Sequence, residues 1–211
     1  MGAVRRTGVG VRLFNGVDIA ATALFSVEGA AAASGAGFDL LGTMVVGFAV
    51  GLGGGIIRDL LLGDAPPAAL RAPSRMVAAL LGAFGAFLVT ALAPQLLELP
   101  LVYLDAVGLA LFAVTGAQKA YEFGCNLLVV TILGATTAVG GGVIRDVLLQ
   151  RAPYVLSESV YGTAALVGAF VTGALLNWLG RPKLALWVGF AATLVLRICA
   201  IHFDWQLPRI A

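Results

Sequence analysis

The feature that most constrains this chain is an internal duplication. The segment "GGGIIRDLLLGDAP" at 53–66 returns as "GGGVIRDVLLQRAP" at 140–153, 87 residues later. Aligned at that offset, residues 18–66 and 105–153 are identical at 22 of 49 positions. Small residues recur by chance in a chain rich in Ala and Gly, but a matched GGG-x-I-R-D-x-L-L-x-x-A-P does not. The chain therefore contains two copies of one structural unit.

Composition places both copies in a membrane. The chain has 211 residues, of which 60% are hydrophobic and 11% charged, and its mean hydropathy is +1.00. Soluble domains average roughly 25% charged residues. A soluble domain of this size has too little interior for so many apolar side chains, so lipid must solvate much of the surface. The net charge of +2 gives no reason to expect a nucleic-acid partner.

Each copy contains three apolar segments long enough to cross a bilayer core, which needs about 20 residues. Repeat one, about 16–93, has segments at about 16–34, 39–62 and 74–93. Repeat two, about 103–178, has them at about 103–120, 125–149 and 156–178, and a seventh at about 184–203 stands alone. We expect a single transmembrane domain over 1–211, all-α, with seven membrane-spanning helices.

The first segment is interpreted as a retained helix rather than a cleaved signal peptide. It contains Asp18 and Glu28, and its counterpart recurs in the middle of the chain. Three spans per copy is an odd number, so the second copy must enter the membrane from the opposite face. The two repeats are therefore inverted about an axis in the membrane plane, an architecture of transporters and channels whose site lies between the repeats.

The two glycine triplets are the first candidate site. They are Gly53, Gly54 and Gly55, and Gly140, Gly141 and Gly142. Each Gly costs about 1 kcal/mol relative to Ala in a helix, so a triplet is a weak point. Close helix packing of the G-x-x-x-G kind is the alternative, but recurrence in both repeats favours functional broken helices. A break would release carbonyl oxygens that attract cations, namely those of Val50, Gly51, Thr137 and Ala138.

The Arg-Asp pairs that follow the triplets must be neutralised, because a charge inside a membrane costs several kcal/mol unless it is paired or hydrated. Adjacent helical residues point about 100° apart, so the two members of a pair are not expected to face each other. Similar depth predicts Asp18–Arg58 and Asp105–Arg145 contacts within each repeat and no pairing between repeats. Asp59 and Asp146 would then be freer to meet water, helix ends or cations. The alternative is that both arginines extend to lipid headgroups.

Other polar residues lie where an ion path could run: Ser26, Glu28, Thr115, Thr136 and Thr137. Glu28 carries the strongest signal, because a carboxylate at mid-membrane depth is a functional-site hypothesis by default. Threonine hydroxyls usually bond to their own helix. For Lys119, extension to the headgroups is favoured over a charge that senses the membrane potential.

No nucleophile–base arrangement or metal spacing is present in the sequence, so we expect no enzyme and no cofactor, with K⁺ or Na⁺ only as a permeant ion.

The paired "GGGIIRD" and "GGGVIRD", in two inverted three-helix repeats followed by a seventh helix, resemble prokaryotic members of the trimeric intracellular cation (TRIC) channel family over about 16–203. The resemblance implies a homotrimer whose subunits each carry a pore lined by the second and fifth helices, bent at their glycines. It implies conduction of monovalent cations, chiefly K⁺. Bacterial relatives have also been labelled glycine transporters, so secondary transport of a small solute such as glycine is the alternative.

Membrane orientation is open at the level of sequence. Basic residues gather on the face that holds the N-terminus, which by the positive-inside rule is then cytoplasmic. Resemblance to eukaryotic TRIC members would place the C-terminus there instead. The high Ala and Gly content suggests a prokaryote, for which the plasma membrane is the expected location.

Overall fold

The computed structural model describes residues 8–93, 100–157 and 160–207, and within them it is entirely helical apart from turns and connections. Seven of its helices are long and apolar enough to span a membrane, as predicted. In chain order the helices are α1 (Gly8–Gly35), α2 (Leu40–Leu61), α3 (Ala68–Arg71), α4 (Pro73–Leu92), α6 (Pro100–Glu122), α7 (Leu127–Leu148), α8 (Tyr154–Ser157), α9 (Gly162–Leu179) and α10 (Pro182–His202). The chain is therefore a multi-pass membrane protein.

One boundary differs from the prediction. The sixth span was expected from about 156 but begins at Gly162, because α8 is a separate short helix. The chain is held at the start of α8 by the backbone N–H of Tyr154, which donates to Asp146 Oδ2 at 2.7 Å.

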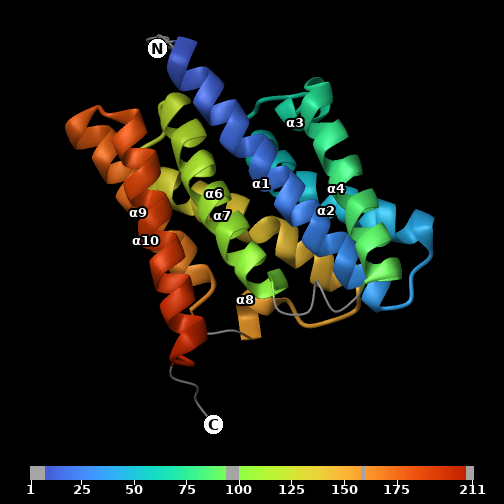
Figure 1. Ribbon diagram of the computed structural model, residues 1–211. Helices are drawn as coiled ribbons and strands as arrows, with labels where there is room; N and C mark the ends of the chain where they lie inside the picture. Colours follow the sequence, from blue (N-terminus) through green and yellow to red (C-terminus); the bar gives the residue numbers. More distant parts are fainter. Residues whose placement is uncertain (1–7, 94–99, 158–159, 208–211) are drawn as a thin grey trace.

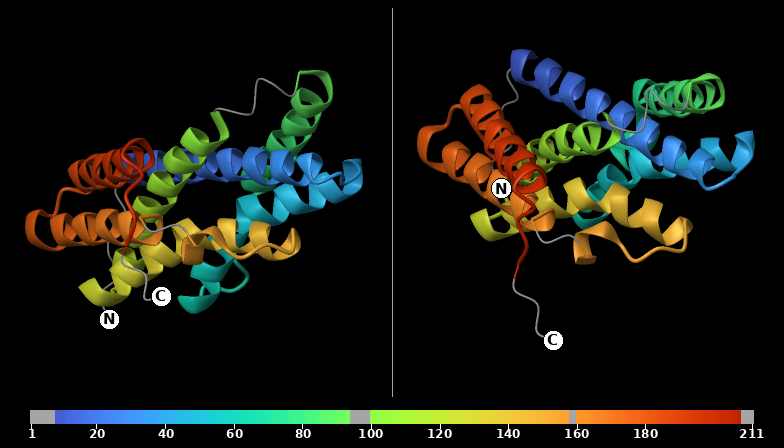
Figure 2. Two further views of the ribbon diagram at one scale, coloured as in Figure 1. Left: turned by 90° about the horizontal axis from the view of Figure 1, so that it is seen from below. Right: turned by 60° about the horizontal axis from the view of Figure 1, so that its bottom comes forward.

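The repeats pack around a centre made of α1, α2, α6 and α7 (Figure 1). Helix α4 lies on one side of this centre and the α9–α10 pair on the other, in both the first view and the turned views (Figure 2). Helices α1, α2 and α4 form repeat one, and α6, α7 and α9 form repeat two. The start of α1 and the end of α10 lie at opposite ends of the molecule, as an odd number of spans requires (Figure 1).

Equivalent residues begin the two central helices in the same way. Asp39 accepts a hydrogen bond from the N–H of Gly42 at 2.7 Å at the start of α2. Asn126, 87 residues later, accepts one from Val129 at 3.0 Å at the start of α7. Each side chain satisfies a backbone donor that has no partner inside its helix. The duplication thus extends to the capping hydrogen bonds.

The same two helices end in matching Schellman motifs. The N–H of Asp64 bonds to the carbonyl of Asp59 at 2.8 Å, and that of Arg151 bonds to Asp146 at 2.8 Å. Such an ending needs one residue in the left-handed conformation. Gly63 has φ of 71° in repeat one, but the equivalent residue in repeat two is Gln150, with φ of 55°. Repeat two therefore places a side chain where the backbone favours glycine.

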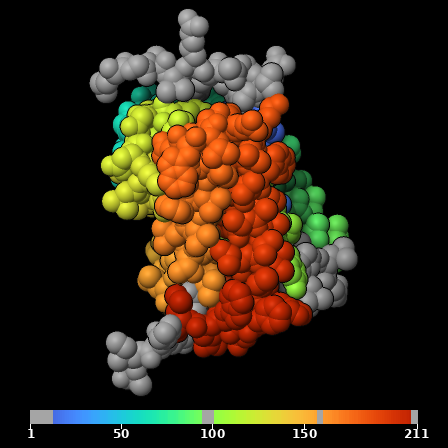
Figure 3. Space-filling model, turned by 90° about the vertical axis from the view of Figure 1, so that its left-hand side faces the viewer, coloured from blue at the N-terminus to red at the C-terminus, as the bar shows by residue number. Residues whose placement is uncertain are grey.

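The surface of α9 and α10 is broadly apolar. These two helices cover the face shown in Figure 3. Their exposed side chains include Phe170, Trp178, Trp187, Val188 and Val195. An exposed surface with so many large apolar side chains is stable against lipid or another apolar surface rather than against water.

Replacing Gln150 with Gly should stabilise the protein, because a left-handed L-residue costs roughly 1–2 kcal/mol. We expect Gln150→Gly to raise the thermal midpoint of the purified protein in detergent, measured by fluorescence of its 3 tryptophans. The matched change Gly63→Ala should lower it. An unchanged midpoint for both variants would contradict the capping analysis.

Candidate functional site

The two repeats meet where the glycine triplets of α2 and α7 cross. A Cβ added to Gly54 would lie 2.2 Å from the carbonyl oxygen of Thr137, and one added to Gly141 would lie 2.6 Å from that of Val50. Thr137 is the repeat partner of Val50, as Gly141 is of Gly54, so the contact is reciprocal, like an isologous contact about a two-fold axis. Backbone therefore touches backbone at the centre of the protein.

The predicted break in these helices is wrong. Helices α2 and α7 are continuous through Gly53–Gly55 and Gly140–Gly142. The carbonyls of Val50, Gly51, Thr137 and Ala138 therefore lie within unbroken helix and are not released by a break. Close packing, the alternative interpretation, is what the triplets do in this structure, because only glycine lets the two backbones approach so closely.

Two cavities lie on either side of this crossing. The first cavity, about 420 Å³, is lined by charged residues Arg58, Asp64, Arg71, Arg75 and Lys119, together with Asn15 of α1. The second cavity, about 260 Å³, is lined by charged residues Glu28, Asp105, Arg145, Asp146, Arg151 and Arg197. Asn15 and Glu28 lie about 20 Å apart along α1, at 1.5 Å per residue. The cavities therefore occupy opposite ends of the spans.

Helix α1 also places the crossing between the cavities. A Cβ on Gly51 would lie 2.7 Å from the carbonyl of Thr22, and one on Gly141 would lie 3.3 Å from the ring of Phe25. Thr22 and Phe25 come after Asn15 and before Glu28 in the same helix. An hourglass arrangement results, with a charged cavity at each end and a tight crossing of helices between them.

In the first cavity, Asp18 joins two arginines. Arg58 Nη1 lies 3.3 Å from Asp18 Oδ1, and Arg75 Nε lies 2.6 Å from Asp18 Oδ2. The expected Asp18–Arg58 contact is therefore present. Arg58 and Asp18 are both buried, so the Arg58 side chain does not extend to the lipid headgroups, which was the alternative interpretation.

Asp59 does not line the first cavity but pairs with Arg58 and Lys119, which do, and the prediction that it is freer is wrong. Its side chain is fully buried and accepts from Arg58 Nε at 2.8 Å, from Lys119 Nζ at 2.6 Å and from the N–H of Ala68 at 2.8 Å. The adjacent Arg58 reaches it because a long side chain curls back to its neighbour, although their Cα–Cβ bonds diverge.

Lys119 does not extend to the headgroups, contrary to the favoured prediction. Its ammonium group is buried and pairs with Asp59 and, at 2.8 Å, with Asp64 Oδ2. Lys119 belongs to repeat two, whereas Asp59 lies in the last turn of α2 and Asp64 just after it, so this is a pairing between repeats, which was not expected. Asp64 lies outside the spans and also pairs with Arg71. Burial acts to raise the pKa of Asp64, but the hydrogen bonds and charges of Lys119 and Arg71 outweigh it and hold this pKa below its ordinary value.

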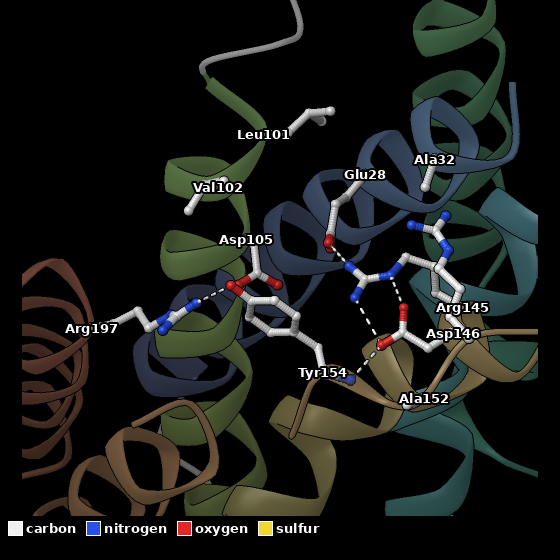
Figure 4. Close-up of a pocket in the computed structure, with 11 residues that line it drawn as sticks. Glu28, Ala32, Leu101, Val102, Asp105, Arg145, Asp146, Ala152, Tyr154 and Arg197 are labelled. Carbon is white, nitrogen blue, oxygen red and sulfur yellow. Dashed lines mark hydrogen bonds and ion pairs between the residues drawn. The ribbon is translucent and has the colours of Figure 1, made fainter. Parts of the chain in front are cut away.

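The second cavity is arranged differently (Figure 4). Arg145 pairs with Glu28 of repeat one, and Arg145 Nε donates to Asp146 Oδ1 at 2.8 Å. The predicted Asp105–Arg145 contact is wrong, because Asp105 instead accepts from Tyr161 Oη at 2.9 Å. Arg145 of α7 pairs with Glu28 of α1 instead, and the residue of repeat two that is equivalent to Glu28 is the uncharged Thr115. Asp146 is not freer either, since it also accepts from the N–H of Tyr154.

Most predicted hydroxyl ligands lie outside both cavities. Ser26 Oγ donates to the carbonyl of Ala79, and Thr137 Oγ1 donates to that of Leu133 at 2.6 Å. Thr115 is likewise buried and bonded to its own helix. Thr136 is half-buried and lines neither cavity. Of these polar candidates, Glu28 is the one that faces a cavity.

Sequence reasoning missed three residues that complete the ion networks: Arg75, Tyr161 and Asp64. Arg75 stands at the start of α4, on the membrane face where α1 begins, so its depth was a usable signal for pairing with Asp18. Tyr161 precedes α9 and is buried, which its sequence position alone does not indicate. Asp64 is the acid of "LLLGDAP" that repeat two replaces with Arg151.

Comparisons with known proteins find relatives that match most of the chain. The family model described as "Glycine transporter" matches the chain twice, over 16–91 and 102–177. The inner membrane protein YadS of Escherichia coli is 33% identical over 196 residues, 92% of this chain and 95% of YadS. The membrane protein YvgT of Bacillus subtilis is 36% identical over 88% of this chain and 90% of YvgT.

Solved structures of the same fold are also known. A TRIC cation channel, studied for the structural basis of conductance, is 41% identical with a TM-score of 0.85, covering 94% of this chain and 97% of that one. A TRIC trimeric intracellular cation channel orthologue from Rhodobacter sphaeroides is 36% identical with a TM-score of 0.86, covering 92% of this chain and 99% of that one.

Adding a methyl group at the crossing should destabilise the protein. For Gly54→Ala and Gly141→Ala we expect the free energy of unfolding to fall by about 1–3 kcal/mol or more, since the new Cβ would overlap a backbone carbonyl. Gly85→Ala on α4 is the matched control, because nothing lies within 4 Å of its added Cβ. Thermal unfolding in detergent measures all three. Equal stability of the crossing variants and the control would show that the helices do not touch there.

The buried pair of Lys119 and Asp59 should be strongly coupled. Lys119→Met and Asp59→Asn are each expected to lower the free energy of unfolding by roughly 1.5–3 kcal/mol, because each removes a hydrogen bond between buried charged groups while Arg58 or Asp64 remains as a second partner. The double variant should lose clearly less than the sum of the two. Arg71→Gln, which removes a half-exposed partner of Asp64, should cost at most about 1 kcal/mol. Chemical unfolding in mixed micelles gives the free energy of unfolding of each single variant and of the double variant. If the two single losses add up to the loss in the double variant, direct pairing of Lys119 and Asp59 would be refuted.

Proposed function

The chain belongs to the family described as "Glycine transporter" and, by its structure, to the prokaryotic TRIC channels, and we propose that it conducts monovalent cations, chiefly K⁺, passively. The observation that carries the proposal is the hourglass itself. Two charged cavities enter the subunit from opposite ends, and a single helix crossing separates them. If α2 and α7 separate slightly at that crossing, the two cavities join and form one continuous pore through the subunit.

We assign the opening of this path to bending of α2 and α7 at their glycine triplets, where helix propensity is lowest. The triplets carry no side chains, so a small separation of the two backbones removes the obstruction. Carbonyls of Val50 and Thr137 already face the opposite triplet. A cation passing between the helices would exchange part of its hydration shell for such oxygens, and weak binding there would permit release.

The ion pairs between repeats give the path its preference for cations. Lys119 of repeat two neutralises Asp59 of repeat one, and Glu28 of repeat one pairs with Arg145 of repeat two. A shift of one repeat against the other would separate both pairs. Glu28 would then lose its partner and its charge would attract cations, whereas Asp59 would stay paired with Arg58 of its own helix.

We propose that the chain works as a homotrimer in a prokaryotic plasma membrane. Support comes from the Rhodobacter sphaeroides orthologue, whose structure is described as a trimeric channel, and from YadS, which is named an inner membrane protein. Lipid would solvate the remaining apolar surface, including part of the α9–α10 face.

Secondary transport of a small solute such as glycine is the second candidate. The description of the matched family and the buried carboxylate Glu28 favour it. A transporter would rock one repeat against the other around the same crossing and would show uptake without unitary currents.

Recording from purified protein in a planar bilayer under asymmetric KCl tests the proposal. We expect discrete current steps that reverse near the K⁺ equilibrium potential. Gly54→Leu and Gly141→Leu should abolish or alter these steps, because a large side chain at the crossing fills the path. Gly85→Leu on the outer helix α4 should conduct like the unmodified protein.

Each variant is first checked for folding by size-exclusion chromatography and thermal unfolding. A silent bilayer with folded, unmodified protein would contradict the channel function. Accumulation of labelled glycine in proteoliposomes that pass no current would establish the transporter instead.

A further inference from the structure

We propose that Arg145 is a two-position switch, whose partner is Glu28 in this structure and Asp105 in the conducting state. The switch rests on the channel function proposed above, since it specifies where Arg145 goes when its pair with Glu28 separates. The duplication supplies the basis, because repeat one already holds the equivalent arginine in the second position.

Repeat one shows one arrangement of the charge cluster. Arg58 Nε donates to the adjacent Asp59 at 2.8 Å, and Arg58 Nη1 lies 3.3 Å from Asp18 of the same repeat. Arg75 Nε also lies 2.6 Å from Asp18, so this buried carboxylate has two cationic partners. Such partners are needed because an unpaired charge inside a membrane is costly.

Repeat two shows the other arrangement. Arg145 is the counterpart of Arg58, and its Nε and Nη2 donate to the adjacent Asp146 at 2.8 and 3.1 Å. Its Nη1, however, pairs with Glu28 of repeat one. The bond from Nε is therefore common to both copies, and the partner of Nη1 is what differs. An arginine held at Nε can exchange the partner of its other end without leaving its neighbour.

Asp105 is the carboxylate that this difference leaves without a cation. It is the counterpart of Asp18 and is only 7% exposed, yet it forms no ion pair with any residue that the structure describes. It accepts instead from Tyr161 Oη at 2.9 Å. The segment "AALLGAF" begins three residues after Arg75 and "AALVGAF" three residues after Tyr161, so these two residues are counterparts. Repeat two thus has a neutral side chain where repeat one has a second arginine.

Glu28 and Asp105 can share the free end of Arg145. Both carboxylates line the second cavity, which they enter from α1 and α6, and Arg145 reaches it from α7 (Figure 4). Arg145 engages one oxygen of Glu28, and Oε2 has no partner within the described residues. Either position of Arg145 leaves one buried carboxylate without a cation. The number of ion pairs is the same in both states, which is the condition for a switch with a small free-energy difference.

The other cations of this cavity do not fill the gap. Arg197 Nη2 donates to Tyr154 Oη at 3.2 Å, and its guanidinium packs over the rings of Tyr154 and Tyr161, 5.4 and 5.1 Å from their centroids. Arg151 is exposed. Arg145 is therefore the cation that the two carboxylates share.

Transfer of Arg145 to Asp105 frees the whole carboxylate of Glu28 inside the cavity. A permeating cation that binds the freed Glu28 favours this state, because a ligand shifts a population toward the form that binds it better. The ion pair between the repeats is lost at the same time, and repeat two acquires the internal pairing of repeat one. Asp105 is thus a positioning residue, which acts on the ion path by withdrawing Arg145 from Glu28.

Thermal unfolding in detergent tests the switch without any current. Asp105→Asn keeps the shape of the side chain and removes its charge, and in otherwise unmodified protein we expect the midpoint to stay or rise, since no cation loses a partner. Glu28→Thr introduces the residue that repeat two carries at this position and should send Arg145 to Asp105. In that background Asp105→Asn should lower the midpoint. Asp18→Asn is the matched control and should lower it in both backgrounds, because two arginines lose a partner.

An equal effect of Asp105→Asn in the two backgrounds would overturn the proposal. So would a loss in otherwise unmodified protein as large as that of Asp18→Asn, a comparison that decides even where Glu28→Thr fails to fold. A structure of Glu28→Thr in lipid nanodiscs gives the direct view. Arg145 at ion-pair distance from Asp105 is expected there, and Arg145 paired with Asp146 alone would contradict the switch.

Planar-bilayer recordings separate the switch from the channel function. Glu28→Thr should lengthen the openings and lower the unitary current, because Arg145 stays at Asp105 while the carboxylate that attracts cations is gone. Asp105→Asn should shorten the openings and leave the unitary current unchanged. Open times that change in the same direction in both variants would overturn the switch. Silence of the folded, unmodified protein would remove the channel function, and the unfolding comparison would still decide whether Arg145 changes partner.

Discussion

The reciprocal contact between Gly54 and Gly141 fixes the rest of the structure. Each glycine lies against a carbonyl of the other helix, so direct backbone contact at these two residues sets the close spacing of α2 and α7. In both helices the Arg-Asp pair follows the triplet by the same number of residues. The crossing therefore places the two charge clusters at opposite ends of the spans. The Arg-Asp side chains of both clusters are paired, because removing the partner of a buried charge is strongly destabilising.

Hydropathy and duplication were sufficient to predict the spans and their inverted arrangement, because bilayer thickness and an odd number of crossings leave few alternatives. Depth along a helix also predicted the Asp18–Arg58 contact. Depth did not predict the partner of Arg145, since Glu28 and Asp105 lie at comparable levels and only the rotation of α1 and α6 about their axes selects between them. That rotation comes from packing, including the burial of Tyr161, and sequence periodicity defines it poorly.

The glycine triplets show a second limit of sequence reasoning. Low helix propensity and close packing both produce Gly-rich segments, and they predict opposite local structures. Packing determined the outcome at Gly54 and Gly141, because each gap left by a missing side chain is filled by the partner backbone. The helices stay continuous, and in the proposed function their low helix propensity is what would let them bend. A channel that opens by a small separation needs both properties in the same residues.

The reciprocity of the α2–α7 contact also bears on how such a chain arose. An isologous surface is self-complementary, so two separate copies of one three-helix unit could form the same crossing. They could do so only by inserting in the membrane in opposite directions. Joining the two units in one chain removes that requirement and leaves α10 without a counterpart. It also frees each half to acquire charges, such as Glu28, that a pair of identical subunits would have to carry twice.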